Sequence, residues 1–226
     1  MKGIDFNMRS FFLYHFIMLR SRRSLKHQYG KAFWKSFRQL SARYFRSVSP
    51  QVPKIGKSIF SLNYCFLPCY VAWYRAFNDL GLKPEEIDRC IWTMNDRMVS
   101  NIPRWMSKNI GKQYYRSFQK KANSHLKRQS LNQSHPLDWK IAYRKLSEEA
   151  FEIDILSCPF QQLSAKLGAD GLLPGICRMD YLFANKLGNG FTRTKTLGDG
   201  DDCCNCHYEM TGNCIWAPET GFETRK

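Results

Sequence analysis

The sequence has no hydrophobic run long enough to cross a bilayer. Its longest stretch of mainly aromatic and aliphatic residues, FFLYHFIML at Phe11–Leu19, has nine residues, whereas a spanning helix needs about 20. The basic segment RSRRS follows it, without the small residues of a signal cleavage site. We therefore expect no cleavable signal sequence, and a helix here that is buried or, as the lesser alternative, grazes a membrane surface.

The cysteine pattern gives no sign of a disulfide framework. The nine cysteines are an odd number, and Cys203 and Cys204 are adjacent. The composition also excludes global disorder, because 43% hydrophobic and 15% aromatic residues are enough for a packed core. Together these features predict a folded, cytoplasmic protein with reduced thiols.

Acidic residues are scarce in the first two thirds of the chain. Residues 1–150 contain 28 Lys and Arg against 9 Asp and Glu, a net +19, whereas residues 151–226 contain 7 against 10, a net −3. Such asymmetry can indicate contact with nucleic acid or an anionic membrane. The basic residues are dispersed among aromatic residues, however, with no recognisable nucleic-acid reading module. We therefore expect solvated helix faces that attract a small anionic substrate. Nucleic acid is not the expected partner, a membrane surface is the lesser alternative, and homo-oligomers stay open.

Helical patterns fill the N-terminal part of the chain. Apolar and aromatic residues recur at helical spacing from 8 to 48, and the two prolines of 49–56 predict a loop. A further helix from about residue 63 is closed by Gly81, and Pro84 begins the next, which ends near 101. Another follows from Pro103. Residues 1–130 are thus predicted to be a helical region.

After the polar, breaker-rich segment 128–138 the period changes. Residues 139–146 and 150–158 predict one hairpin, and 191–200 and 201–210 a second. Two helical segments, 159–168 and 172–188, lie between the hairpins. The prediction is an α+β fold: an N-terminal helical half packed on a C-terminal four-stranded antiparallel sheet, with two helices inserted between the hairpins. Region 138–210 forms the α+β part, 211–226 a frayed tail, and the whole one compact unit.

The segment GDGDDCCNCHYEM, Gly198–Met210, concentrates thiols and carboxylates. If it is a strand, Cys204 and Cys206 share one face, and Cys203 and His207 the other. The segment alone is therefore a poor zinc site. A composite of Cys158, Cys177 and Cys204 would suit a soft divalent metal such as zinc, or would be core or catalytic thiols. We prefer the thiols without a cofactor.

Several motifs resemble those of the L-2-amino-thiazoline-4-carboxylic acid hydrolase family. They are CPF beginning at Cys158, C-x-x-D-Y beginning at Cys177, and RTKTLGDGDDCC from Arg193 to Cys204. The resemblance extends from about residue 30 to Tyr208. Where the family ends in D-F-R, this chain has Asn205–Cys206–His207. The arrangement is also similar to 4-vinyl-reductase-type ligand domains, which supply the alternative of a non-catalytic binding or sensing protein.

The hydrolase resemblance implies a reaction in which water adds at C2 of a cyclic amidine (a thiazoline). The ring sulfur leaves as a thiolate, giving an N-carbamoyl cysteine. The expected catalytic residues are Cys204 as the first candidate nucleophile, Cys177 as the second, and the carboxylates Asp180 and Asp202 for the amidinium and the water.

The implied substrate-binding residues are Arg193, Lys195 and Tyr181, the first because a guanidinium pairs bidentately with a carboxylate. Structural alternatives stay open for the charged residues. Arg193 could be an exposed strand cation, Asp180 the partner of a salt bridge to Arg178, Arg193 or Lys186, and Asp202 a turn residue. We expect His207 at the rim, and the histidines at 15, 27, 125 and 135 in solvent.

Overall fold

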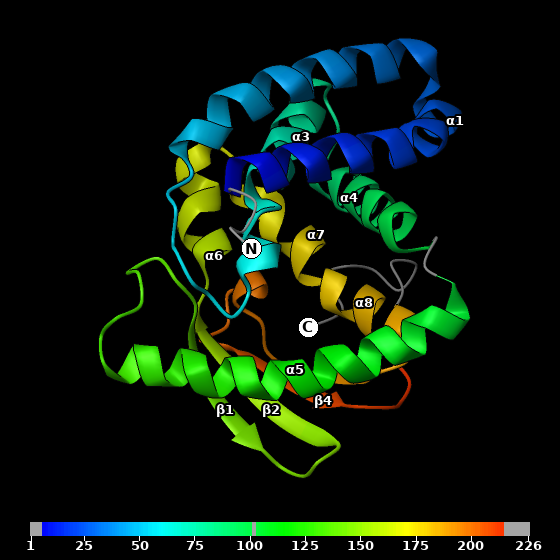
Figure 1. Cartoon of the computed structure of the whole chain (residues 1–226). Coiled ribbons are helices and arrows are strands. Elements are labelled where there is room, and N and C mark those ends of the chain that lie inside the picture. The colour runs from blue at the N-terminus through cyan, green and yellow to red at the C-terminus, as the bar shows by residue number, and fades with distance from the viewer. Residues whose placement is uncertain (1–5, 101–102, 215–226) are drawn as a thin grey trace.

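The computed structural model describes residues 6–100 and 103–214. A four-stranded antiparallel sheet lies at one side of the molecule and the helices are stacked over one of its faces (Figure 1). The predicted α+β fold is confirmed. The strands are β1 (Lys140–Lys145), β2 (Ala150–Ser157), β3 (Gly190–Arg193) and β4 (Cys204–Glu209).

Five helices make up most of the N-terminal part: α1 (Phe6–Val48), α2 (Ser61–Tyr64), α3 (Leu67–Asp79), α4 (Pro84–Val99) and α5 (Arg104–Ser130). Between the hairpins lie α6 (Pro159–Ser164), α7 (Leu173–Cys177) and α8 (Met179–Leu187), with short 3-10 turns at Ala165–Leu167 and Asp170–Leu172. The two inserted helical segments predicted from the sequence are thus broken into shorter pieces. A 3-10 turn at Ser49–Gln51 lies in the predicted loop.

Helix α1 turns back on itself at Gly30, whose φ is 89°. Glycine tolerates this left-handed conformation because it has no Cβ. The two arms of α1 run antiparallel across the top of the view in Figure 1 and pack on α3 and α4.

The starts of α3 and α4 follow from local sequence. The predicted helix from residue 63 is interrupted before α3, whose second residue is Pro68; proline fits the first turn of a helix but not its interior. Helix α4 begins with Pro84, and the Glu86 side chain accepts a 2.9 Å hydrogen bond from the Lys83 backbone N–H. This capping satisfies a donor that the helix itself leaves unpaired.

The sheet has the strand order β1-β2-β4-β3. Its two hairpins join between β2 and β4, where Ile155 is paired with Cys204 and Ile153 with Cys206. On the inner face Phe151, Ile153 and Cys206 are buried. The sheet therefore has one face packed on the core, as expected of an antiparallel sheet with helices on one side.

The outer face of the sheet is charged. Arg144 donates to Glu152 at 2.9 Å and to Asp154 at 2.7 Å. His207 Nδ1 lies 3.5 Å from Glu152 Oε1 on the same face. His207 is therefore on the opposite face from Cys204, as the strand alternation predicts.

The hydrophobic core is continuous from the helices to the sheet. His125 on α5 is fully buried, and its Nε2 lies 2.9 Å from the carbonyl oxygen of Trp139, just before β1. Ser58 donates a 2.6 Å hydrogen bond to Asp138 in the same region. The prediction that His125 is solvated is wrong, because the approach of α5 to Trp139 could not be read from its polar sequence neighbours.

Two other expectations concern the ends of the chain and the membrane. The tail predicted at 211–226 lies mostly outside the described residues, and the division into two regions stays a prediction. Among the described helices, none has the length and apolarity needed to span a membrane.

Candidate functional site

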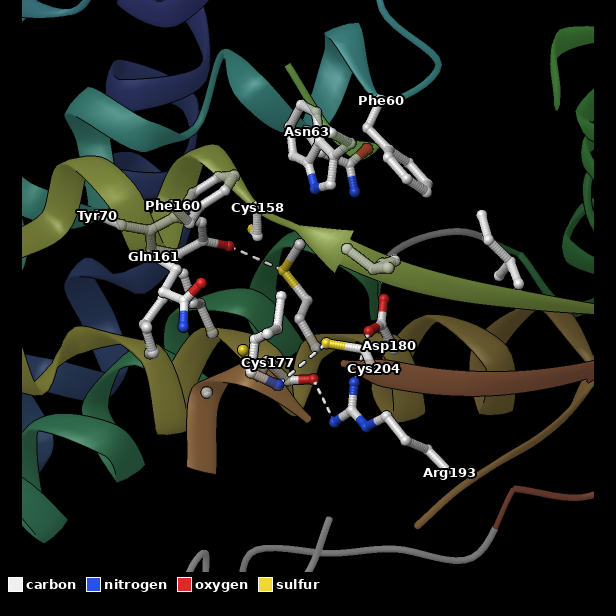
Figure 2. A pocket seen from close by; sticks show the side chains of 18 of the residues that line it. Phe60, Asn63, Tyr70, Cys158, Phe160, Gln161, Cys177, Asp180, Arg193 and Cys204 are labelled. Carbon is white, nitrogen blue, oxygen red and sulfur yellow. Dashed lines mark hydrogen bonds and ion pairs between the residues drawn. The ribbon is translucent and has the colours of Figure 1, made fainter. Parts of the chain in front are cut away.

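A small cavity lies between the inner face of the sheet and the helices α3, α6, α7 and α8. Its volume is about 110 Å³, well below the roughly 300 Å³ or more of sites for drug-sized ligands. Aromatic and aliphatic side chains form most of its lining, among them Phe60, Tyr70, Trp139 and Phe160. In Figure 2, Cys177, Asp180, Arg193 and Cys204 gather on one side, opposite Phe60 and Asn63. The cavity can therefore hold only a small molecule.

An ion pair forms the most polar part of the cavity lining. Arg193, the last residue of β3, lies 3.1 Å from Asp180 of α8 through its Nη1. Its Nη2 donates a 2.9 Å hydrogen bond to the carbonyl oxygen of Cys177 at the end of α7. The Arg193 side chain is 1% exposed, so its charge requires this compensation. The alternative of an exposed strand cation is wrong, and the salt bridge from Asp180 to Arg193 is confirmed.

Burial and the Arg193 guanidinium affect the pKa of Asp180 in opposite directions. Burial raises the pKa of the Asp180 carboxyl, and Arg193 offsets part of this rise by its charge and hydrogen bond. The net shift is upward. Asp180 is therefore a more basic carboxylate than one in water, as a general base requires.

The Cys204 thiol lies at a backbone turn. Its Sγ accepts a 3.3 Å hydrogen bond from the Leu197 N–H and lies 3.4 Å from Thr196 Oγ1. Leu197 begins the 3-10 turn η4 (Leu197–Asp199), whose N-cap residue is Thr196. Burial raises the pKa of Cys204, although the two hydrogen bonds and Arg193 lower it in part. The thiol is thus neutral at pH 7, with donors already placed around its sulfur.

Cys158 and Cys177 also line the cavity. Burial raises the pKa of Cys158 to about 12 and also raises that of Cys177. A Cβ added to Gly198 would lie 2.6 Å from Cys177 Sγ, so only glycine lets the turn approach this sulfur. Within the part of the chain that the structure describes, no three His, Cys, Asp or Glu residues are grouped as metal ligands. The composite of Cys158, Cys177 and Cys204 is therefore not arranged as a metal site here.

Two predicted site residues, Asp202 and Lys195, do not reach the cavity. Asp202 is on the surface, where it forms a 3.1 Å ion pair with Lys195. Lys195 does not follow Arg193 inward because β3 ends at Arg193. Beyond it, Asn205 Oδ1 accepts hydrogen bonds from the Thr194 and Lys195 N–H groups and holds the chain away. The expectation that Asp180 and Asp202 act together at one site does not fit this arrangement, because only Asp180 lines the cavity. Asp202 fits the alternative interpretation of a turn residue.

Tyr181 supports the site from behind. Its ring lies 5.4 Å from the Arg193 guanidinium carbon and packs edge-on against Phe191. Its hydroxyl donates a 3.5 Å hydrogen bond to the Arg193 carbonyl oxygen. Tyr181 is therefore placed to hold Arg193 and not to contact a ligand in the cavity.

The sequence interpretation missed polar residues from other segments. Asn63 and Gln161 line the cavity. Tyr70 does so too, and its hydroxyl donates to Asn95 at 2.7 Å. The only sequence signal for Tyr70 was its place in FLPCYVAWYRAF, which marks a helix but does not say which side chain faces a cavity. Asn63 and Gln161 gave no signal.

A second buried charge cluster, also missed, lies behind the cavity. Asp199 of η4 accepts two hydrogen bonds, of 3.0 and 2.9 Å, from Arg178 Nη2, and Arg178 is fully buried. Asp88 of α4 lies close to Gly175 of α7, where an added Cβ would be 2.5 Å from its Oδ1. Burial raises the pKa of Asp88 to about 7, and Arg178 only partly offsets this. The cluster joins α4 to α7, which carries Cys177, and to η4, which carries Gly198.

Fold and site together define an α+β protein with a small cavity that combines neutral thiols with one carboxylate–guanidinium pair. The chain belongs to the L-2-amino-thiazoline-4-carboxylic acid hydrolase family, whose model matches residues 64–208, more than half of its length. This is the family that the motifs around Cys158, Cys177 and Arg193 indicated, and its name is that of a hydrolase. No curated protein matches the chain.

Proposed function

We propose that this protein is a hydrolase that opens a small cyclic amidine, a thiazoline bearing a carboxylate, by adding water at C2. The new C–O bond forms as the C2–S bond breaks, and the ring sulfur takes up a proton to become the thiol of an N-carbamoyl cysteine. The observation that carries the proposal is the Asp180–Arg193 pair lining a small cavity beside the Cys177 and Cys204 thiols. The family match supports the reaction class.

The charges of the cavity complement those of such a substrate. A protonated amidine is positive and its carboxylate negative, so the molecule as a whole is neutral. The amidinium would bind to Asp180 and the carboxylate to Arg193, replacing the ion pair that the two residues make with each other. A ligand with only one charge would compensate one member of the pair and not the other, which is costly where the side chain is buried, as that of Arg193 is.

The thiol pKa values favour water over a thiolate as the nucleophile. Burial raises the pKa of both Cys204 and Cys177, so neither is a thiolate at pH 7. Asp180, whose pKa is also raised, takes the proton of the attacking water. Cys204 then supplies a hydrogen bond to the departing sulfur, with its own sulfur held by the Leu197 N–H. We further propose that no metal is required.

The test is turnover of 2-amino-thiazoline-4-carboxylate by the purified chain, measured through the release of a free thiol. Asp180→Asn is expected to reduce kcat by about a hundredfold or more, since general-base catalysis contributes on the order of 10²–10⁴. The matched control is Asp202→Asn, which removes an exposed carboxylate of another family motif and should leave turnover unchanged. Full activity in Asp180→Asn would contradict the proposal.

Two further measurements separate the alternatives. Mass spectrometry of the quenched reaction should find no adduct on Cys204; a covalent intermediate there would replace water as the first nucleophile. Elemental analysis should find no bound metal; one metal per chain, lost in Cys158→Ala or Cys204→Ala, would contradict the metal-free reaction. Tight binding of the substrate without any turnover would instead support a sensing protein.

A further inference from the structure

The first arm of α1 carries a row of solvent-exposed apolar side chains. Five large residues are between 47 and 68% exposed: Met8, Phe11, Phe12, Phe16 and Leu19. Their spacing of three and four residues places them on one face of the helix, which we call the apolar stripe. The expectation that Phe11–Leu19 is buried holds for Tyr14, Ile17 and Met18 and is wrong for the stripe.

A basic groove begins where the apolar stripe ends. It lies between the two arms of α1, has a volume of about 920 Å³, and is lined by residues of both arms. Six of these are cations and none is acidic; the cations are Arg22, Lys26, Lys31, Lys35, Arg38 and Arg46. The apolar and aromatic part of the lining includes Tyr14, His15, Leu19 and Trp34. His15 and Leu19 connect the groove with the stripe.

The cations of the basic groove have no carboxylate partner among the described residues. Within residues 6–100 and 103–214, none of the six forms an ion pair with a carboxylate. Partial burial, followed by the charges of Arg22, Lys31 and Arg38, lowers the pKa of the Lys26 ammonium, as expected where like charges crowd together. The groove thus concentrates positive charge that an external anion would compensate.

We propose that this face of α1 binds the surface of a bilayer containing anionic phospholipid. Phenylalanine and leucine side chains enter the boundary between headgroups and acyl chains, while neighbouring lysine and arginine pair with headgroup phosphates. The apolar stripe and the basic groove supply both parts side by side on one helical hairpin. A nucleic acid would use the cations but leave the stripe in water, and a second copy would bring two positive grooves together.

Co-sedimentation of the full chain with lipid vesicles tests the proposal. Vesicles of phosphatidylcholine mixed with phosphatidylserine should bind it at least about tenfold more tightly than phosphatidylcholine alone, because several cations each contribute to binding. Raising the salt concentration should weaken this binding, since the contacts are screened. Equal binding to both kinds of vesicle, or none to either, would overturn the proposal.

Two pairs of variants locate the surface. Phe12→Ser with Phe16→Ser, and separately Lys31→Glu with Lys35→Glu, should each lower vesicle binding by about tenfold or more. The matched controls are Leu146→Ser, an equally exposed leucine of the first hairpin, and Lys120→Glu with Lys121→Glu on α5. The controls should bind as the unaltered chain does. Equal losses in the controls would show that net charge and not this face is responsible.

The same variants identify a different occupant. A single-stranded oligonucleotide that outcompetes the vesicles, and whose binding is lost in Lys31→Glu with Lys35→Glu but kept in Phe12→Ser with Phe16→Ser, would overturn the membrane proposal in favour of nucleic acid. Self-association of the chain that Phe12→Ser abolishes would assign the stripe to a dimer instead. Unchanged thermal unfolding midpoints in all variants show that any loss of binding does not come from misfolding.

Discussion

Arg193 at the cavity and Arg38 in the basic groove carry the same charge in different surroundings. Arg193 is almost completely buried and is held by Asp180 and a carbonyl oxygen, whereas Arg38 is exposed among other cations. A buried charge without a partner is very costly, but an exposed one is solvated. The interior site is therefore fixed by internal pairing, while the surface of α1 is free to respond to an external anion.

The strongest test of this contrast removes the partner of the buried charge. Asp180→Ala removes the carboxylate that compensates the buried Arg193 guanidinium, which should cost about 3 kcal/mol of folding free energy. Urea unfolding measures the loss. Asp202→Ala, which breaks the exposed pair with Lys195, should leave the unfolding midpoint unchanged. Equal effects of the two variants would show that the interior pair is no more important than the surface pair.

A second prediction concerns the packing of the cavity lining. Gly198→Ala would bring a Cβ to 2.6 Å from Cys177 Sγ and should cost about 2 kcal/mol, a usual value for overpacking. Cys177→Ala in the same chain removes the sulfur and should recover part of that loss. Gly200→Ala is the control: its cost comes from a φ of 88°, with no atom within 4 Å of the added Cβ. Cys177→Ala should not reduce the stability loss caused by Gly200→Ala.

The pH dependence of stability should report on Asp88. Its pKa is raised from an unfolded value of about 4 to about 7 by burial. Between these two pH values Asp88 is protonated in the folded state and ionised in the unfolded state. Its contribution to stability is complete below about pH 4 and is lost as the pH rises to about 7 and beyond. The slope is at most about 1.4 kcal/mol per pH unit. In Asp88→Asn, unfolding measured between pH 5 and 8 should lose this part of the slope; an unchanged slope would exclude Asp88 as its source.

The smallest effect is expected on the exposed side of α1. Phe12 is 60% exposed, so Phe12→Ser should change the free energy of unfolding by no more than about 0.5 kcal/mol. Phe37→Ser is the interior counterpart, since Phe37 is fully buried in the core and stacks on Phe77. A large loss of stability in Phe12→Ser would show that the stripe is part of the core.

The sequence predicted the fold class because its periods are clear. The alternation of Phe151, Ile153 and Ile155, and of Cys204 and Cys206, placed the right side chains on the inner face of the sheet. The breaks within the inserted helices were not predicted. They fall at the 3-10 turns Ala165–Leu167 and Asp170–Leu172 and at Arg178, where the spacing of apolar residues shows no interruption.

The site was predicted in part for the same reason. Cys158, Cys177, Asp180, Arg193 and Cys204 all line one cavity, as strand alternation and the family motifs together suggested. Lys195 was placed wrongly because the alternation was extended past the end of β3 at Arg193, and Asp202 because it was extended to a residue before the start of β4 at Cys204. Asn63 and Tyr70 come from distant helices, and no local pattern shows that they meet the sheet. The exposure of Phe12 and Phe16 likewise depends on which face α3 and α4 leave uncovered.

The junction of β2 with β4 has a consequence for how the molecule assembles. Each hairpin joins neighbours in sequence and can form within microseconds, but Ile155 meets Cys204 only after the intervening chain has folded back. Loop closure over such a separation is slow. The cavity is therefore among the last features to be completed during refolding. The time at which the Cys204 thiol stops reacting with an added alkylating reagent marks that closure.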